Sequence, residues 1–534
     1  MRTPAESLLV QTYKNIMKRT FVIAMLAVSL FGAQAFAADG TKLEGGFLDG
    51  DKYLGVFSDT ENTYTVTISP GSEDYSNIEI WGCENDYEMT NVTMTGGAVK
   101  QIIGRHTDQD HNQSETLTDC IITMEGGLVD GDVVGGLFLC RLTPSERLHE
   151  LQQHTINISD GTVMGDVIGN MRNDGISVNV FVSLGKINIS GGTIGGAVIA
   201  GMNTYGHITA CDVEASDVRL NKGVTGGVTA NGVSFGNHAI VKNCVVAGDI
   251  IGGQAAGNAY VNQAIITESE TGNVIGGVST EGDATNNIVS LVNSTVLGKV
   301  IGGESATGDA KNNTITVAGG IIEGEVVLAQ AGQNRVATDN KLILIGSGAQ
   351  YKGVTGDNIL IKNNILVGGG GGGESGNTGN AIDIYGTGIS IENQGQILGV
   401  QELNFFLTNN LVEAEAPMLT MDSVLSTKGI GYDLELNFNA AEALDWKPGD
   451  SVTLVSTGFG IQLDPSLLAK EYDIKYTDPV SQEEMLTAIA RLELIQDGTT
   501  LKLTVTGNIP EPTTGTLSLL ALTALAVRRR RRRM

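Results

Sequence analysis

The residues best suited to chemistry in this sequence are a short run of imidazole and carboxylate side chains, His106, Asp108, Asp110 and His111. Strand-like alternation would place His106, Asp108 and Asp110 on one side, where such groups together can bind zinc or a similar metal. The same residues also fit a solvated polar insertion that follows Gly104. We therefore assign no metal site, keep these three residues only as candidates, expect no cofactor, and leave bound calcium open.

No catalytic set stands out elsewhere. Glycoside hydrolysis needs a pair of carboxylates, and polysaccharide lyases need a base and calcium. Carboxylates are so abundant here that some will lie close together by chance, and the Asn-Thr-Asp, Asp-Asp and Arg-x-Lys patterns of pectin-degrading families are absent from the sequence. We expect a protein that is not an enzyme, with a polysaccharide lyase or glycoside hydrolase as the alternative.

Composition limits the elements that must position any site. The chain has 534 residues, 72 of them glycine and only 9 proline, so it is too long for one ordinary globular core and does not resemble a proline-rich linker. Aromatic residues are 5%, and a core must therefore consist of Val, Ile, Leu and Ala. The net charge of −27 repels nucleic acid and anionic membranes and suits a secreted protein that is soluble or binds cations.

Five cysteines, Cys83, Cys120, Cys140, Cys211 and Cys244, do not have metal-site spacing. An odd number excludes complete pairing within the chain. Cys120 and Cys211 lie on strand-like segments and are expected to fill the core as small apolar side chains. A disulfide bond between Cys120 and Cys140 remains an alternative if the compartment is oxidising.

One phrase recurs along the chain, a pair of Val or Ile residues followed by glycine. Its later copies are 24 to 26 residues apart, and its earlier copies are farther apart, as expected if they carry loop insertions. The copies begin at Ile102, Val133, Val167, Val198, Val224, Ile250, Val274 and Val300, and the series ends at Val326.

Between these phrases lie alternating segments such as 155–159, 186–190 and 313–317, which have the period of a strand. A unit of strand, turn, strand and turn cannot bury its own apolar face, but stacked copies can. Residues 38–399 are therefore predicted to form a Gly-rich, right-handed parallel β-helix, and the fold class is all-β. An array of β-sandwiches is the rival.

Asparagine pairs stand at the unit boundaries. Asparagine tolerates the left-handed backbone and can form stacked amide ladders. We expect both features at Asn286-Asn287, Asn312-Asn313 and Asn363-Asn364.

After residue 400 glycine becomes less frequent and the strand-like segments lengthen. Residues 400–507 are predicted to form a β-rich cap, because the open end of a solenoid exposes unpaired edges. Residues 479–489 read as a short helix, with Ser481 as N-cap and Glu484 at the capping-box position.

The first 37 residues have the three parts of a signal peptide. Lys18 and Arg19 precede an apolar stretch at 21–31, and the Ala-x-Ala site Ala35-Phe36-Ala37 is followed by Ala38. Cleavage is expected there, and Met17 is a possible true start. The alternative is a buried apolar helix.

The last 27 residues, 508–534, also read as a processing signal. Pro510-Glu511-Pro512 keeps the chain extended, as a protease cleft requires. Residues 517–527 form an apolar segment that can enter a bilayer. Basic residues resist translocation and hold the end of the chain in the cytoplasm. They are Arg528, Arg529, Arg530, Arg531, Arg532 and Arg533.

This arrangement resembles the PEP-CTERM sorting signal of bacteria, and an ordinary C-terminal membrane anchor is the alternative. The resemblance implies recognition by an exosortase after signal peptidase has acted, and a connection with the cell surface, exopolysaccharide and biofilm. The Gly-rich body is similar in composition and layout to the passenger region of autotransporter-type adhesins, although no specific motif is shared. We expect an exported surface or matrix protein, structural or adhesin-like, whose partners are extracellular polysaccharide or other surfaces and which contacts membrane only through its terminal segments.

Overall fold

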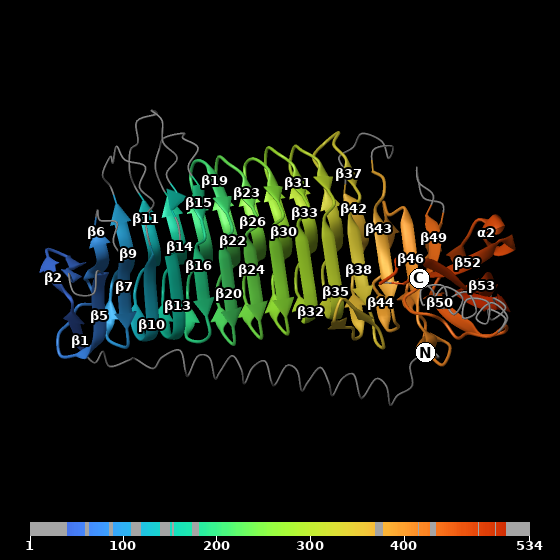
Figure 1. Ribbon diagram of the computed structural model, residues 1–534, viewed down its shortest axis with the longest axis horizontal. Coiled ribbons are helices and arrows are strands. Elements are labelled where there is room, and N and C mark those ends of the chain that lie inside the picture. Colours follow the sequence, from blue (N-terminus) through green and yellow to red (C-terminus); the bar gives the residue numbers. More distant parts are fainter. Residues whose placement is uncertain are drawn as a thin grey trace, which may run out of the picture.

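The computed structural model describes residues 40–508 except 59–62, 85–88, 108–118, 139–149, 152–153, 173–180, 369–376, 415, 428–433, 479 and 497. The described chain is a long stack of parallel strands, and its turns follow one another in chain order from β1 at one end to β53 at the other (Figure 1). It is a parallel β-helix, as predicted from the repeats.

Three sheets form the sides of the stack. Sheet B has 14 strands, and sheet C has 8. The strands of sheet B are β2 (Gly46–Asp49), β3 (Lys52–Gly55), β6 (Glu79–Glu84), β9 (Gln101–Thr107), β11 (Val133–Phe138), β14 (Val167–Arg172), β18 (Val198–Asn203), β22 (Val224–Thr229), β26 (Ile250–Ala255), β30 (Val274–Ser279), β33 (Val300–Ser305), β36 (Val326–Gln330), β42 (Ile365–Gly368) and β45 (Ile397–Leu398). Those of sheet C are β12 (Glu150–Leu151), β15 (Phe181–Ser183), β19 (His207–Thr209), β23 (Ser234–Phe235), β27 (Ala259–Tyr260), β31 (Ala284–Thr285), β34 (Ala310–Lys311) and β37 (Ala337–Thr338).

Sheet A has 28 strands. A column of longer strands comprises β5 (Thr63–Gly71), β7 (Met89–Met94), β10 (Cys120–Val129), β13 (His154–Val163), β16 (Lys186–Ile189), β20 (Asp212–Ser216), β24 (His238–Lys242), β28 (Gln263–Thr267), β32 (Ile288–Val296), β35 (Thr314–Ile322), β38 (Lys341–Ile345), β43 (Ala381–Tyr385), β46 (Glu402–Leu407), β49 (Glu435–Ala440) and β52 (Glu471–Thr477). A second column beside it comprises β8 (Ala98–Val99), β17 (Thr193–Ile194), β21 (Arg219–Leu220), β25 (Val245–Val246), β29 (Glu270–Thr271), β41 (Ile359–Ile361), β44 (Ile389–Ile391), β47 (Leu419–Met421) and β50 (Ser451–Thr457). The remaining members are β1 (Gly40–Glu44), β4 (Phe57–Ser58), β53 (Glu484–Ile495) and β54 (Thr500–Asn508).

One turn of the chain, which we call a rung, visits all three sides. In the rung from β28 to β31 the chain passes through sheet A, then sheet B, then sheet C, before β32 starts the next rung. Tight turns separate successive strands. Two of them contain a residue with left-handed backbone: Glu268 (φ 50°), between β28 and β29 of sheet A, and Asn286 (φ 55°), between β31 of sheet C and β32 of sheet A.

The repeated Val/Ile phrases lie in register on sheet B. Val274 pairs with Ile250 on the rung before it and with Val300 on the rung after it, and the same register runs from Ile102 to Val326. The series does not end at Val326 as expected, because Ile365 and Ile397 continue the column. The phrases therefore mark one continuous face of the stack.

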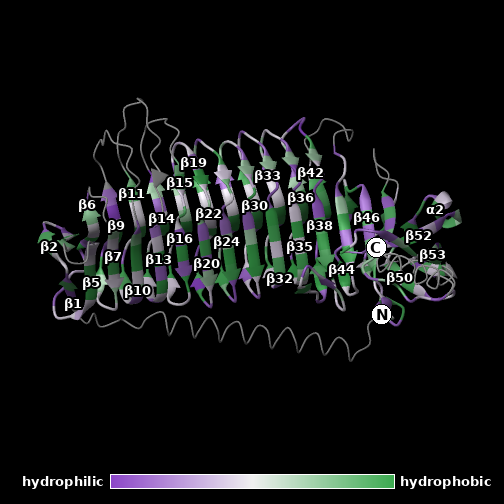
Figure 2. Cartoon of the chain, viewed as in Figure 1, coloured by the Kyte–Doolittle hydropathy of each residue, from purple (hydrophilic) through white to green (hydrophobic). Residues whose placement is uncertain are grey.

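The interior is one apolar cluster that extends from Tyr53 to Val505 and consists mainly of Val, Ile, Leu and Ala side chains. Hydrophobic segments recur in rung after rung along the whole stack (Figure 2). Cys120 and Cys211 are fully buried in this cluster, and burial raises the pKa of each thiol to about 12. Their predicted role as core fillers is confirmed.

Glycine is required at the two positions of the repeated phrase for different structural reasons. A Cβ on Gly276 would lie far inside van der Waals contact of the carbonyl oxygen of Gly302 on the next rung. A Cβ on Gly277 would overlap the side chain of Asn287, which projects into the interior. The first glycine therefore permits close stacking of neighbouring rungs, and the second makes room for asparagine.

Those asparagines form a buried amide ladder at the corner between sheets C and A. Each Nδ2 except that of the last member, Asn380, donates to Oδ1 of the asparagine on the next rung, at 2.9 to 3.2 Å. Asn287 and Asn313 belong to this ladder, and the residues before them, Asn286 and Asn312, have φ of 55°. The prediction for these two pairs is confirmed. The ladder comprises Asn237, Asn262, Asn287, Asn313, Asn340 and Asn380.

The third asparagine pair was placed wrongly. Asn363 and Asn364 lie between β41 and β42, at a different corner. There Asn363 Nδ2 donates to the Glu323 carbonyl at 2.8 Å, and Asn364 Oδ1 accepts from the Gln396 N–H at 2.9 Å. These amides satisfy exposed backbone groups rather than each other.

The expected boundary at residue 400 does not coincide with a change in strand pairing on sheet A. β43 pairs in parallel with β46, and β46 with β49. Sheet B ends at β45, just before residue 400. The decrease in glycine after residue 400 therefore coincides with the end of sheet B. Antiparallel pairing at this end involves β50, β52, β53 and β54.

The predicted helix at 479–489 is wrong, because β53 (Glu484–Ile495) occupies most of that range. Its Ala488, Ala490 and Leu492 are buried at alternate positions, which is the period of a strand. Within the described residues the helical segments are the 3-10 turn η2 (Asn409–Leu411) and α2 (Pro465–Ala469), where the Asp464 side chain accepts from the Ser466 N–H.

Candidate ligand-binding face on sheet C

The strands of sheet C are very short. In each rung, one residue of this sheet points inward, and the residues directly before and after it in the sequence point outward. The inward positions, such as Ala259, Ala284 and Ala310, are buried. The outward residues before them form what we call the first row, which is Phe181, His207, Val233, Asn258, Asp283, Asp309 and Val336. The outward residues after them form the second row, which is Thr209, Phe235, Tyr260, Thr285, Lys311 and Thr338.

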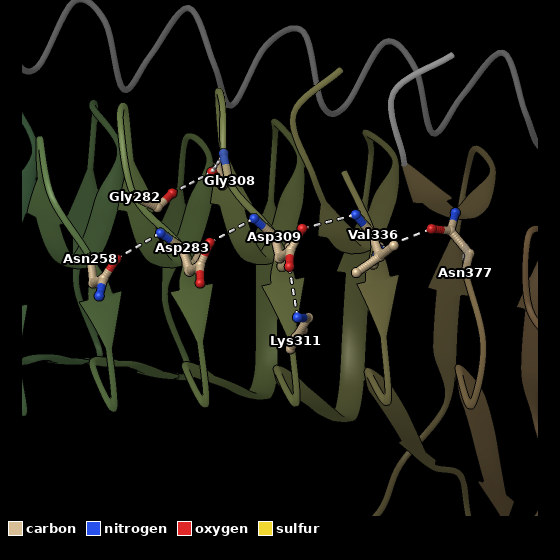
Figure 3. Close-up of polar contacts among 12 residues, drawn as sticks. Asn258, Gly282, Asp283, Gly308, Asp309, Lys311, Val336 and Asn377 are labelled. Atoms are coloured by element: carbon tan, nitrogen blue, oxygen red, sulfur yellow. Dashed lines mark hydrogen bonds and ion pairs between the residues drawn. The ribbon is translucent and has the colours of Figure 1, made fainter. Parts of the chain in front are cut away.

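Side chains of the first row bond along the stack (Figure 3). Oδ1 of Asn258 accepts from the Asp283 N–H at 2.9 Å, and Oδ1 of Asp283 accepts from the Asp309 N–H at the same distance. Oδ1 of Asp309 accepts from the Val336 N–H at 3.1 Å. Each carboxylate or amide thus satisfies the loop backbone of the following rung.

Asp309 also forms an ion pair with Lys311 of the second row, at 2.7 Å. Burial alone would raise the pKa of Asp309, but hydrogen bonds from Lys311 and from the Val336 N–H outweigh it and lower the pKa. The carboxyl group is therefore ionised at neutral pH. An ionised group of this kind does not suit the general acid of a glycosidase.

Aromatic rings occupy four successive rungs of the same face. The ring centroids of Phe181 and His207 are 5.1 Å apart, and those of Phe235 and Tyr260 are 4.7 Å apart. Phe235 is 39% exposed, a large fraction for an aromatic side chain within a sheet. The Val233 N–H donates to Nδ1 of His207 at 3.2 Å, which orients that ring.

The candidate metal ligand His106 lies elsewhere. It is on β9 of sheet B, buried, with its ring centroid 4.2 Å from that of Trp81. Asp108 and Asp110 fall outside the described residues, as do Cys140, the expected cleavage residues Ala35, Ala37 and Ala38, and the expected sorting residues from Pro510 to Arg533. Within the described ranges, no three His, Cys, Asp or Glu side chains lie close enough together to hold a metal ion.

A cavity of about 260 Å³ lies at the C-terminal end of the stack, between β49 and α2. Glu435, Asp464 and Lys470 contribute polar groups to its wall, beside Leu467 and Tyr472. We assign it no role.

Comparisons with protein-family models, curated proteins and solved structures found no match. In the part of the chain that the structure describes, no helix has the length and apolar character needed to cross a membrane.

The sequence analysis did not single out the aromatic rings, although a signal for them exists. From Phe235 onward the second-row residue stands two positions before an asparagine of the buried ladder, as in Phe235-Gly236-Asn237 and Tyr260-Val261-Asn262, whereas Thr209 stands two positions before Cys211. Once those asparagines are known, the outward positions of sheet C can be read directly from the sequence.

Proposed function

We propose that this chain is an exported structural protein of the cell surface or extracellular matrix, adhesin-like, whose β-helix acts as a rigid spacer. One observation carries the proposal, the unbroken stack. Fourteen strands of sheet B at the usual separation of about 4.8 Å give a length of roughly 60 Å. The apolar core and the strand ladders run along that length, and the buried amide ladder reinforces the rungs from Asn237 to Asn380.

Export is proposed from the terminal segments. Signal peptidase would act after Ala37, and an exosortase would recognise Pro510-Glu511-Pro512 with its apolar segment and arginine tail. The strongly negative charge of the whole chain suits a body that stays in water outside the cell. Polysaccharide or neighbouring surfaces are the proposed partners.

An exosortase-dependent route is tested with Glu511→Ala in the full chain, expressed in a host that has the enzyme. We expect the variant to accumulate as a longer precursor in the membrane fraction, while the wild type is shortened and reaches the surface. Glu483→Ala, which changes an exposed glutamate of the body, is the matched control and should be processed normally. Normal processing of Glu511→Ala contradicts the proposed route.

A β-helix lyase or glycoside hydrolase is the second candidate, because Asp283 and Asp309 stand on consecutive rungs with Lys311 beside them. Against it, both carboxylates accept backbone hydrogen bonds, and the pKa of Asp309 is lowered. Incubation of the secreted protein with a polysaccharide panel should release no reducing ends and no unsaturated products. Turnover that disappears in Asp283→Asn would establish the enzyme instead.

A further inference from the structure

We propose that the outer face of sheet C binds a neutral polysaccharide chain laid along the axis of the stack. Phe235 and Tyr260 would stack on its sugar rings, and Asn258, Asp283 and Thr285 would hydrogen-bond its hydroxyl groups. This inference deepens the proposed function, on which it rests, because it names a ligand class and a site for the exposed body.

The rings supply the first step of the argument. Phe235 and Tyr260 project from adjacent strands, and their centroids are 4.7 Å apart. Aromatic faces attract the C–H groups of a pyranose ring, and Tyr adds a hydroxyl that can bond to the sugar. Phe181 and His207 extend the aromatic surface by two rungs, so that it covers roughly 15 Å between the first and the last ring.

The ring of Phe235 is exposed to solvent, in contrast to the rings of a similar patch on sheet A. There Tyr385 is 6% exposed, because the hairpin of β39 (Gln350–Tyr351) and β40 (Val354–Thr355) packs over it. Tyr351 of that hairpin has its ring centroid 5.1 Å from that of Tyr385. The chain thus covers one outward aromatic patch with its own residues and leaves the other in contact with solvent, where Phe235 is 39% exposed.

Polar side chains follow the aromatic rings along the outer face of sheet C. The ladder of the first row engages Oδ1 of Asn258 and Asp283, which leaves Nδ2 of Asn258 and Oδ2 of Asp283 for an external partner. Thr285 follows Tyr260 in the second row, one rung farther along. Rings followed by amide, carboxylate and hydroxyl groups match the apolar faces and hydroxyl edges of a sugar chain.

Shape and charge select the class of polymer. The face is two residues wide and many rungs long, whereas a stable protein interface buries about 800 Å² on each partner. The net charge of −27 and the carboxylates of the first row disfavour polymers of uronic acids. The charge of Lys311, in the second row, is matched by Asp309 at 2.7 Å. A linear neutral polysaccharide fits these conditions.

The test is affinity electrophoresis and pull-down of the processed, secreted protein with neutral glucans, mannans, xylans and galactans, and with alginate and polygalacturonate as acidic polymers. We expect at least one neutral polymer to bind. Phe235→Ala/Tyr260→Ala should weaken that binding by about tenfold or more, since two stacking contacts are lost. Phe235→Trp/Tyr260→Trp should keep it.

Phe459→Ala is the matched control, because Phe459 is 67% exposed near the C-terminal end of the stack, away from sheet C. It should bind as the wild type does. The proposal is overturned if no neutral polymer binds, if only acidic polymers bind, or if the double alanine variant, with unchanged circular dichroism and melting, binds normally. None of these results bears on the processing of Glu511→Ala, so the two proposals fail separately.

Discussion

Asn287 uses the full hydrogen-bonding capacity of its buried amide. Its Nδ2 donates to the Ala259 carbonyl and to Oδ1 of Asn313, each at 3.0 Å. Its Oδ1 accepts from the backbone N–H of Asn262 at 3.1 Å and from Nδ2 of the same residue at 3.2 Å. A buried polar network of this kind is stabilising only while every member is satisfied.

We therefore expect Asn287→Ala to lower the free energy of unfolding by about 2 to 4 kcal/mol, since it leaves donors and acceptors of three neighbouring residues unsatisfied. Asn286→Gly is the matched control. Asn286 has φ of 55°, which glycine adopts without strain, so the change should be close to neutral. Denaturant titrations of both variants measure the difference, and equal stabilities would contradict the role of the ladder.

His154 is a second residue with a distinct consequence. Burial, aided by the charge of Arg105, lowers its pKa to about 3 from the ordinary value of 6.5. The unfolded chain therefore takes up a proton near pH 6.5 that the folded protein does not. Stability that is present above pH 6.5 is lost as the pH falls toward 3, by about 1.4 kcal/mol per unit.

Between pH 7 and pH 5 the wild type should thus lose about 2 kcal/mol more of its unfolding free energy than His154→Gln loses. His238→Gln is a control of opposite sign. The hydrogen bond from His238 to Asp212 raises the pKa of His238, so its contribution is present at low pH and is lost as the pH rises. Parallel pH profiles for the wild type and His154→Gln would exclude the effect.

At the scale of the strand and its corners, the register on sheet B could be predicted, because the Val/Ile phrase repeats in the sequence. The separate reasons for Gly276 and Gly277 could not, since one depends on a carbonyl of the next rung and the other on Asn287 in three dimensions. The false helix at 479–489 arose because Ser481 and Glu484 form a capping pattern, and pairing with β52 and β54 overrides it. The antiparallel hairpin of β2 and β3 was not predicted.

The close packing at Gly276 gives a prediction at this scale. Gly276→Ala should destabilise the stack by several kcal/mol, because its Cβ would overlap the Gly302 carbonyl and two packed rungs would have to separate. Gly507→Ala is the control. The nearest atom to a Cβ there would be 3.9 Å away, an ordinary contact. Melting temperatures that fall equally in both variants would show that close stacking is not the reason for the glycine.

At the scale of the whole molecule, the contacts between neighbouring rungs provide most of the stability, as in other repeat proteins. Deletion of residues 274–299 removes one complete rung and joins Asn273 to Val300, so that β26 meets β33 in the native register. This variant should fold and be shorter by about 5 Å in small-angle scattering. Deletion of 274–286 joins positions from different sides and should prevent folding. If both deletion variants fail to fold, the view that each rung is an independent unit of the stack is contradicted.

The strands at both ends of this stack are arranged so that they offer few groups for further strand pairing. Near the start the hairpin of β2 and β3 turns back on itself, and the opposite end closes with antiparallel β53 and β54. The last strands of sheets B and C, β45 and β37, have only two residues each. Short or antiparallel edges give another molecule little to pair with. The number of repeats encoded in the gene therefore sets the length of the stack, and end-to-end strand pairing with a second molecule is disfavoured.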